Sequence, residues 1–176
     1  MRKLLLAVFL FTTASAIAQE KSDFPTNGYR GSGFVYMATN GDDFDTYSFG
    51  STHGYQINPK WFIGGGMQLN YGSLFYKQED HIFVSITEYA NIRLDMIKKR
   101  ISPYLNLKTG YTLGDIEGVL VVPEVGVRFR HFNVGIGVEC QSHEAVYGLN
   151  IKQNDEDEFS ELFMIRLAYD FCGRKK

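Results

Sequence analysis

The chain has 176 residues, with 18 basic and 20 acidic side chains and a formal charge of −2 at pH 7. This weakly acidic balance gives no reason to expect binding to nucleic acid, whose phosphates require a basic face. The length corresponds to a single domain, and abundant Tyr, Phe and Gly with only 4 Pro are typical of β-strands.

The first 18 residues have the parts of a secretory signal peptide. The basic residues Arg2 and Lys3 precede a short apolar run over 4–11 and the small-residue site Ala16-Ile17-Ala18. We therefore predict a signal peptide over 1–18, an N-terminal segment over 19–28, a barrel domain over 29–172 and a basic tail over 173–176. No later stretch approaches the ~18 apolar residues of a membrane-spanning helix, which leaves a soluble exported domain or a membrane barrel.

Apolar and polar residues alternate through most of the remaining chain, and successive side chains of a strand point to opposite faces. Within 103–113, Leu105, Leu107 and Tyr111 share one face, whereas Asn106 and Lys108 share the other. This pattern predicts eight strands, over 29–39, 46–58, 61–71, 82–96, 103–113, 119–130, 132–141 and 162–171. The first strand has no clean alternation, so its faces are not assigned.

The predicted connections alternate between short and long. Short turns fall at 58–60, 97–100 and 130–131, and longer loops fall at 40–45, 73–80 and 142–160, with a shorter connection at 114–118 on the same side. Outer-membrane barrels have short periplasmic turns and longer extracellular loops. The loop pattern therefore favours a membrane barrel with its short turns in the periplasm.

The polar face of these strands suits the inside of a narrow barrel. It is rich in glycine, which relieves crowding, because eight strands enclose an interior only just wide enough for side chains. It also carries four basic and four acidic residues, a balance that a closed interior requires because unpaired buried charge is costly. This predicted interior polar network consists of Arg93, Asp95, Lys108, Glu124, Arg128, Glu139, Arg166 and Asp170.

The apolar face then meets lipid, with aromatic residues near the periplasmic edge as in an interfacial girdle: Trp61, Phe62, Phe129, Phe132, Tyr169 and Phe171. One residue conflicts with this assignment. Glu88 falls on the lipid face, where a carboxylate is costly, and the sequence leaves open whether it lies at the outer interface or on a bulge. The alternative is a soluble barrel with the apolar face turned inward around an apolar ligand.

Three regions resemble small bacterial outer-membrane β-barrel proteins, namely the turn region Tyr55–Gly66, the segment Tyr89–Arg93 followed by Ile101–Tyr104, and the strand Pro123–Phe129. The resemblance, spread over about 55–171, implies an eight-stranded antiparallel up-and-down barrel like the OmpA transmembrane domain or OmpX. These segments are structural signatures and carry over no catalytic residue. Such barrels often end on an aromatic residue, whereas here Cys172 and a basic tail follow Phe171.

Candidate chemistry is weak elsewhere. The four His residues lie in separate segments without metal-ligand spacing, so no metal or cofactor is predicted. Some small outer-membrane barrels are lipid A hydrolases with a Ser and a His on the lipid-facing wall, and Ser51 and His53 share a face. No G-x-S-x-G motif strengthens that reading. Cys140 and Cys172 fall at opposite ends of adjacent strands, too far apart for a disulfide.

We therefore predict an integral protein of the Gram-negative outer membrane with a structural or surface-interaction role, a polar plugged interior and no open pore. It is not expected to be an enzyme, and a lipid-modifying activity is the less favoured alternative. A monomer is expected, with membrane lipid as its partner. The acidic run over 154–158 could bridge to lipopolysaccharide through divalent cations, although it lacks the order of a dedicated Ca²⁺ loop. A partner for the 142–160 loop is not identifiable from the sequence.

Overall fold

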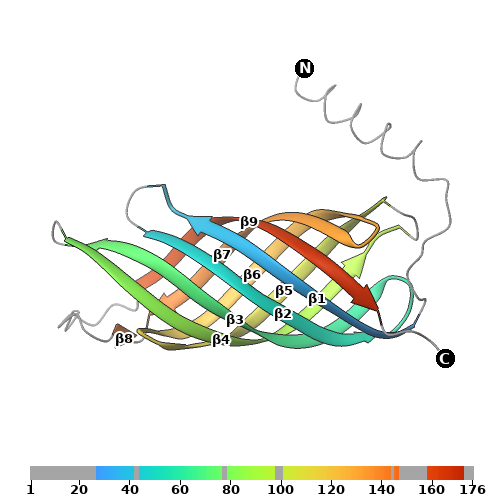
Figure 1. Cartoon of the computed structure of the whole chain (residues 1–176), viewed down its shortest axis with the longest axis horizontal. Helices are drawn as coiled ribbons and strands as arrows, with labels where there is room; N and C mark the ends of the chain where they lie inside the picture. The colour runs from blue at the N-terminus through green and yellow to red at the C-terminus, as the bar shows by residue number, and fades with distance from the viewer. Residues whose placement is uncertain are drawn as a thin grey trace, which may run out of the picture.

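The computed structural model describes residues 27–41, 44–76, 79–97, 101–143, 145–146 and 158–172, which form a closed antiparallel barrel of tilted strands (Figure 1). The predicted signal peptide over 1–18, the basic tail over 173–176 and the acidic run up to Asp157 lie outside the described residues. No helix within the described ranges is long and apolar enough to cross a membrane.

Eight strands build the barrel wall. Consecutive wall strands pair antiparallel, and β9 pairs with β1 to close the ring, which confirms the predicted eight-stranded up-and-down barrel. The wall strands are β1 (Gly28–Thr39), β2 (Phe44–Gln56), β3 (Trp61–Tyr76), β4 (Glu79–Asp95), β5 (Ile101–Gly114), β6 (Ile116–Phe129), β7 (Phe132–His143) and β9 (Glu158–Cys172). The two-residue β8 (Ala145–Val146) pairs with the start of β6 and adds no member to the ring.

Several strands are longer than the sequence predicted at the long-loop end. The expected loop over 73–80 is largely a hairpin, in which Tyr76 of β3 pairs with Glu79 of β4. The expected connection over 114–118 reduces to Asp115, whose backbone N–H donates to Val84 at 3.1 Å and whose Oδ2 accepts from the Val84 N–H at 2.8 Å. Backbone pairing continues beyond the predicted strand ends because it satisfies polar groups that a loop would leave to water.

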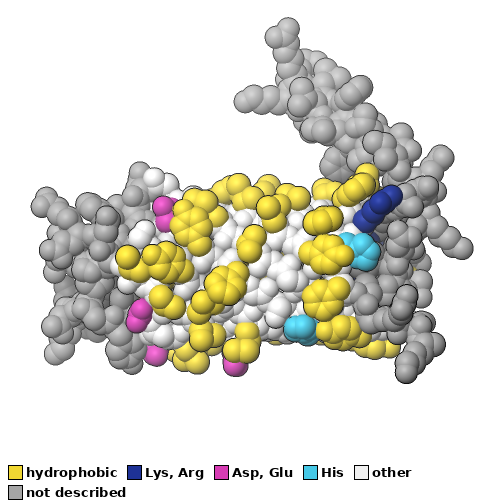
Figure 2. Space-filling view, in the orientation of Figure 1, with side chains coloured by type: hydrophobic (Ala, Val, Ile, Leu, Met, Phe, Trp, Pro, Cys, Tyr) yellow, Lys and Arg dark blue, Asp and Glu magenta, His cyan; other side chains and the backbone are white. Residues whose placement is uncertain are grey.

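The outer surface of the wall is apolar. Large apolar side chains are exposed on every wall strand, among them Phe49, Ile63, Ile92, Leu107 and Ile165. Figure 2 shows hydrophobic side chains (yellow) spread over the face of the wall between the two ends of the barrel. This arrangement is the opposite of the soluble alternative, which requires the apolar face inside.

The structure assigns the faces of β1 that the sequence left open. Arg30, Phe34, Tyr36 and Ala38 are buried inside the barrel, whereas alternate residues such as Val35 point outward. The alternation is obscured in the sequence because two of the inward residues are aromatic and one of the outward-facing positions near them is a glycine. The sequence of β1 alone therefore does not determine which of its two faces points into the barrel.

One predicted member of the aromatic girdle is wrong. Phe62 is 4% exposed and lies inside the barrel, where the Arg30 guanidinium is 5.5 Å from its ring centroid. Its neighbour Trp61 points outward at 42% exposure. Strict alternation along β3 decides this difference, since adjacent strand residues cannot share a face.

Glycines on facing strands make room for the inward aromatic rings. A Cβ atom at Gly66 would lie 2.7 Å from the Tyr89 hydroxyl and would clash with the carbonyl oxygen of Ser51. The aromatic side chain of Tyr89 thus occupies space that a larger residue in β3 would fill.

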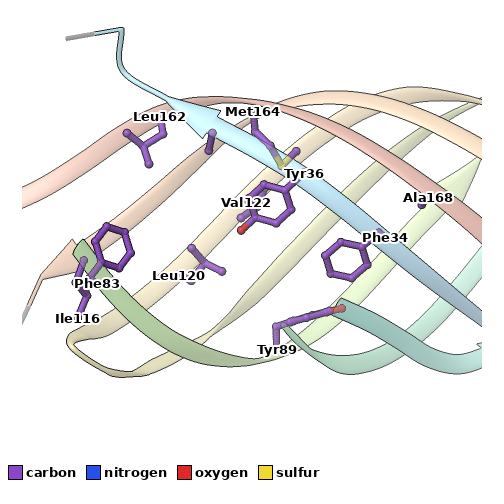
Figure 3. Packing of buried hydrophobic residues seen from close by; sticks show 11 residues of the cluster. Phe34, Tyr36, Phe83, Tyr89, Ile116, Leu120, Val122, Leu162, Met164 and Ala168 are labelled. Carbon is purple, nitrogen blue, oxygen red and sulfur yellow. The ribbon is translucent and has the colours of Figure 1, made fainter. Parts of the chain in front are cut away.

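The plug is not polar throughout, which modifies the prediction of a polar interior. Toward the long-loop end the interior is filled by a buried apolar cluster that includes Phe83, Ile116, Leu120, Leu162 and Met164 (Figure 3). The arginine–aspartate ion pairs lie in the other half, whereas hydrogen-bonded polar side chains such as Asn70, Thr87 and Thr112 share the long-loop half with the apolar cluster. The barrel is therefore sealed by apolar packing at one end and by ion pairs at the other.

Candidate functional site

The first cluster of the interior network lies at the short-turn end, around two aspartates. Arg30 reaches both carboxylates, with Nη1 2.9 Å from Asp95 Oδ2 and Nη2 bonded to Asp170 Oδ2. Arg93 Nε lies 3.1 Å from Asp95 Oδ1, and Arg128 Nε lies 3.9 Å from the same oxygen. All five side chains are buried. The cluster ties β1, β4, β6 and β9 together across the barrel.

A second cluster surrounds Glu124 of β6. Arg166 donates from Nε to Glu124 Oε1 at 2.9 Å, the Tyr104 hydroxyl donates to the same oxygen, and Asn106 Nδ2 donates to Oε2 at 3.1 Å. The Arg93 guanidinium carbon lies 3.9 Å from the centroid of the Tyr104 ring and connects this cluster to the first. Each carboxylate oxygen of Glu124 thus has a donor, as a buried carboxylate requires.

Lys108 is the exception in the network. Its side chain is fully buried, and its Nζ has no hydrogen-bond partner in the described structure. It lies instead over aromatic rings, 3.9 Å from the centroid of Phe34, 5.0 Å from Tyr89 and 5.3 Å from Tyr36. Cation–π attraction is therefore the contact that the interior offers this ammonium group.

All eight charged residues that the sequence placed inside are buried, and the structure adds a ninth, Arg30. Most of them meet in the two clusters, but Lys108 and Glu139 form no ion pair with any described residue. Sequence reasoning missed Arg30 because the faces of β1 were unassigned. No signal within β1 could have found it, because the bulky Phe34 and Tyr36 share its parity and resemble an outward, apolar face.

The interior holds little free space. A cavity of about 10 Å³, lined among others by Arg30, Phe62, Arg93 and Arg166, has room for about one water molecule. Eight-stranded barrels are filled by their own side chains in this way.

On the outer wall, Ser51 and His53 lie on the same face of β2 as predicted from their spacing. His53 Nδ1 is 2.6 Å from the Tyr29 hydroxyl, and its ring makes an edge contact with Phe171 at 5.9 Å between centroids. Ser51 lines a shallow groove with Phe49, Met67, Leu69 and Ile86. No carboxylate hydrogen-bonds to His53 within the described residues, so the serine and histidine lack the third member of a hydrolytic triad.

Glu88 lies on the outer wall without a bulge. It pairs with Met67 of β3 and Tyr111 of β5 in uninterrupted ladders, and its side chain is exposed. On the same face, Ile82, Val84 and Ile86 lie toward the long-loop end from Glu88, and Ala90 and Ile92 lie toward the short-turn end. The carboxylate therefore lies inside the apolar belt and beside a groove formed with Met67, Ala90 and Thr109.

The remaining candidates are structural. Cys140 is a free cysteine that pairs with Glu161 toward the long-loop end, whereas Cys172 pairs with Arg30 at the other end. Within the described part of the chain, no group of three His, Cys, Asp or Glu residues is arranged to hold a metal ion.

Comparisons with known proteins support the fold. No family model and no curated protein sequence matches the chain. A solved structure, described as the outer membrane enzyme PagL, superposes with a TM-score of 0.56 over 78% of this chain and 98% of its own, at 13% sequence identity. This similarity establishes an outer-membrane type of barrel fold, whereas no family model supports the narrower resemblance to OmpA and OmpX.

Proposed function

We propose that this protein is an integral barrel of the bacterial outer membrane with a structural or surface-interaction role and no open pore. The observation that carries the proposal is the combination of an apolar outer wall with an interior filled by ion pairs at one end and apolar packing at the other. Among β-sheet structures, a closed barrel is the one that satisfies every backbone group within a membrane, because it leaves no unpaired edge.

Two measurements on the full chain test this proposal. The first is gel mobility of the outer-membrane fraction, run unheated and boiled, where a heat-dependent shift is expected for a folded membrane barrel. The second is the conductance of planar bilayers containing the folded protein, where no stepwise openings are expected. Recovery in the soluble periplasm without a mobility shift would contradict the membrane location, and steady single-channel currents would contradict the sealed interior.

A lipid-modifying activity is a second candidate, and one observation favours it. Ser51 and His53 project from the lipid-facing wall beside a groove, and a protein of similar fold is named as an outer membrane enzyme. The test is acyl release from lipid A by the wild-type chain, Ser51→Ala and His53→Ala. Thr109→Ala is the control, because Thr109 also carries a hydroxyl on the outer wall. Activity that is lost in the first two variants and kept in the control would favour the enzyme.

Divalent bridging between the 154–158 run and lipopolysaccharide also remains a proposal. It predicts that Ca²⁺ raises the thermal stability of the wild-type protein in lipopolysaccharide-containing membranes. The same addition should have no effect on a variant in which the acidic residues of the run are replaced by Asn and Gln.

A further inference from the structure

Apart from Glu88 in the apolar belt, the exposed charges on the outside of the barrel differ between its two ends. Lys60 and Arg130 are exposed at the short-turn end, together with the half-buried His131, whereas the exposed acids Asp115 and Glu161 lie toward the long-loop end. On the face seen in Figure 2, Lys or Arg (dark blue) and His (cyan) side chains lie toward the end where β9 finishes, and Asp and Glu (magenta) lie away from it. At the short-turn end the described acids are buried and paired with arginine, as shown above.

The first cation of this rim is held in place by a tight turn. The Asn58 side-chain oxygen accepts hydrogen bonds from the backbone N–H groups of Lys60, at 2.9 Å, and Trp61, at 3.0 Å. The Lys60 carbonyl in turn accepts from the N–H of Asp95 at 2.7 Å. These bonds fix consecutive residues at the edge of the apolar belt, an exposed ammonium next to an outward indole.

The second cation lies on the β6–β7 turn, across the barrel from the first. Arg130 has a φ of 54°, a left-handed conformation that favours glycine, and its guanidinium carbon lies 5.8 Å from the centroid of the Phe129 ring. The following His131 is bound to β9, since its carbonyl accepts from Asp170 N–H at 2.6 Å and its ring stacks on Tyr169. Glycine would adopt this backbone conformation without strain, yet the chain has arginine here. Strained positions of this kind are often functional.

We propose that the basic rim formed by Lys60, Arg130 and His131 binds the phosphate groups of anionic phospholipids in the leaflet at the short-turn end. Each of the two exposed cations directly precedes or follows an outward aromatic residue in the chain, Trp61 after Lys60 and Phe129 before Arg130. Trp side chains sit at the headgroup level of a membrane, while Lys and Arg extend from the apolar region to the charged surface. The inference rests on the proposed membrane location and goes beyond it by naming the lipid class and the residues.

The chain provides its own probe, because Trp61 is its single tryptophan and adjoins Lys60. The protein is folded into two preparations of vesicles that have the same content of phosphatidylcholine and phosphatidylglycerol. In the first preparation the phosphatidylglycerol is brominated, and in the second an equal mole fraction of phosphatidylcholine is brominated instead. Bromine quenches tryptophan fluorescence on contact, so the two quenching curves give the relative occupancy of each lipid at the rim. We expect phosphatidylglycerol to be enriched about fivefold next to Trp61, the effect of one basic residue near an anionic surface.

The matched variants separate this site from general attraction to the membrane. Lys60→Gln should reduce the enrichment at Trp61 to near one, and so should about 1 M salt, at which the screening length is about 3 Å. Arg130→Gln should leave the Trp61 signal unchanged, because the two turns lie on opposite sides of the barrel. In a protein that carries Trp61→Phe and Phe129→Trp, the tryptophan lies next to Arg130. In that protein Arg130→Gln should reduce the enrichment, and Lys60→Gln should leave the signal unchanged.

Equal quenching by the two brominated lipids in the unaltered protein would overturn the proposal, as would enrichment that survives Lys60→Gln. Neither result would affect the membrane location. That location is tested separately by the heat-dependent mobility shift and by the presence of any quenching by brominated lipid. The same mobility shift shows that each variant has folded.

Discussion

Arg30 and Asp170 are bonded inside the barrel although 140 residues separate them in the chain. Arg30 lies near the start of the first wall strand and Asp170 near the end of the last, so their ion pair spans the seam at which β1 and β9 close the ring. The same guanidinium bonds to Asp95 across the interior. Arg30 therefore contributes both to closing the ring of strands and to pairing the buried charges of the interior.

Asp170→Asn should destabilise the barrel, because it leaves Arg30 and Arg93 with less negative charge in a buried site. Loss of one partner from a buried ion pair costs about 3–5 kcal/mol. The measurement is the urea midpoint for loss of the heat-dependent mobility shift in lipid vesicles. The double variant Arg30→Gln with Asp170→Asn should recover part of the loss, and a single variant as stable as the wild type would contradict the role of the seam pair.

Lys108→Met should behave in the opposite way. Its ammonium group has no hydrogen-bond partner and lies over aromatic rings, so methionine removes a desolvated charge and keeps most of the packing volume. Burial of an ion costs several kcal/mol of desolvation, and an ammonium group without a hydrogen-bond partner recovers little of that cost. The same urea titration should show a midpoint equal to or above that of the wild type. A clear decrease would show that the cation–π contacts outweigh the cost of burial.

Glu88→Leu should stabilise the folded protein in lipid, because it removes a carboxylate from the apolar belt. Basic residues at the bilayer midplane cost about 2–4 kcal/mol in such barrels and acidic residues less, so a gain of about 1–2 kcal/mol is expected. Ile86→Glu is the matched control, since it adds a carboxylate to the same face of β4 and should destabilise. Loss of stability in Glu88→Leu would mean that the carboxylate contacts a group outside the described chain.

Two glycine substitutions should differ sharply. Gly66→Ala places a Cβ atom against the Ser51 carbonyl and the Tyr89 hydroxyl inside the wall, whereas a Cβ at Gly33 meets nothing within 4 Å. We expect Gly66→Ala to lower the stability by about 2 kcal/mol or more through overpacking. Gly33→Ala should stay within about 0.5 kcal/mol of the wild type. Similar folding yields and urea midpoints for the two variants would contradict the close approach of Tyr89 to β3.

Much of this fold follows from local patterns in the sequence. A period of two residues assigns Leu107 and Lys108 to opposite faces without knowledge of any neighbour. The chain therefore determined the strands after the first, their inward and outward faces, and the positions of the short turns. Pairs such as Ser51 and His53 share a face for the same reason, although their spacing does not reveal that His53 bonds to Tyr29.

The tertiary structure decided what depends on contacts across the barrel. The inward placement of Arg30, Phe34 and Tyr36 is fixed by the pairing of β1 with β2 and β9, which turns this parity toward the interior. The position of Glu88 without a bulge is likewise a property of two continuous ladders. Closure brings together residues from opposite ends of the chain, and their partners depend on the register and on the available volume, which alternation along a single strand does not contain.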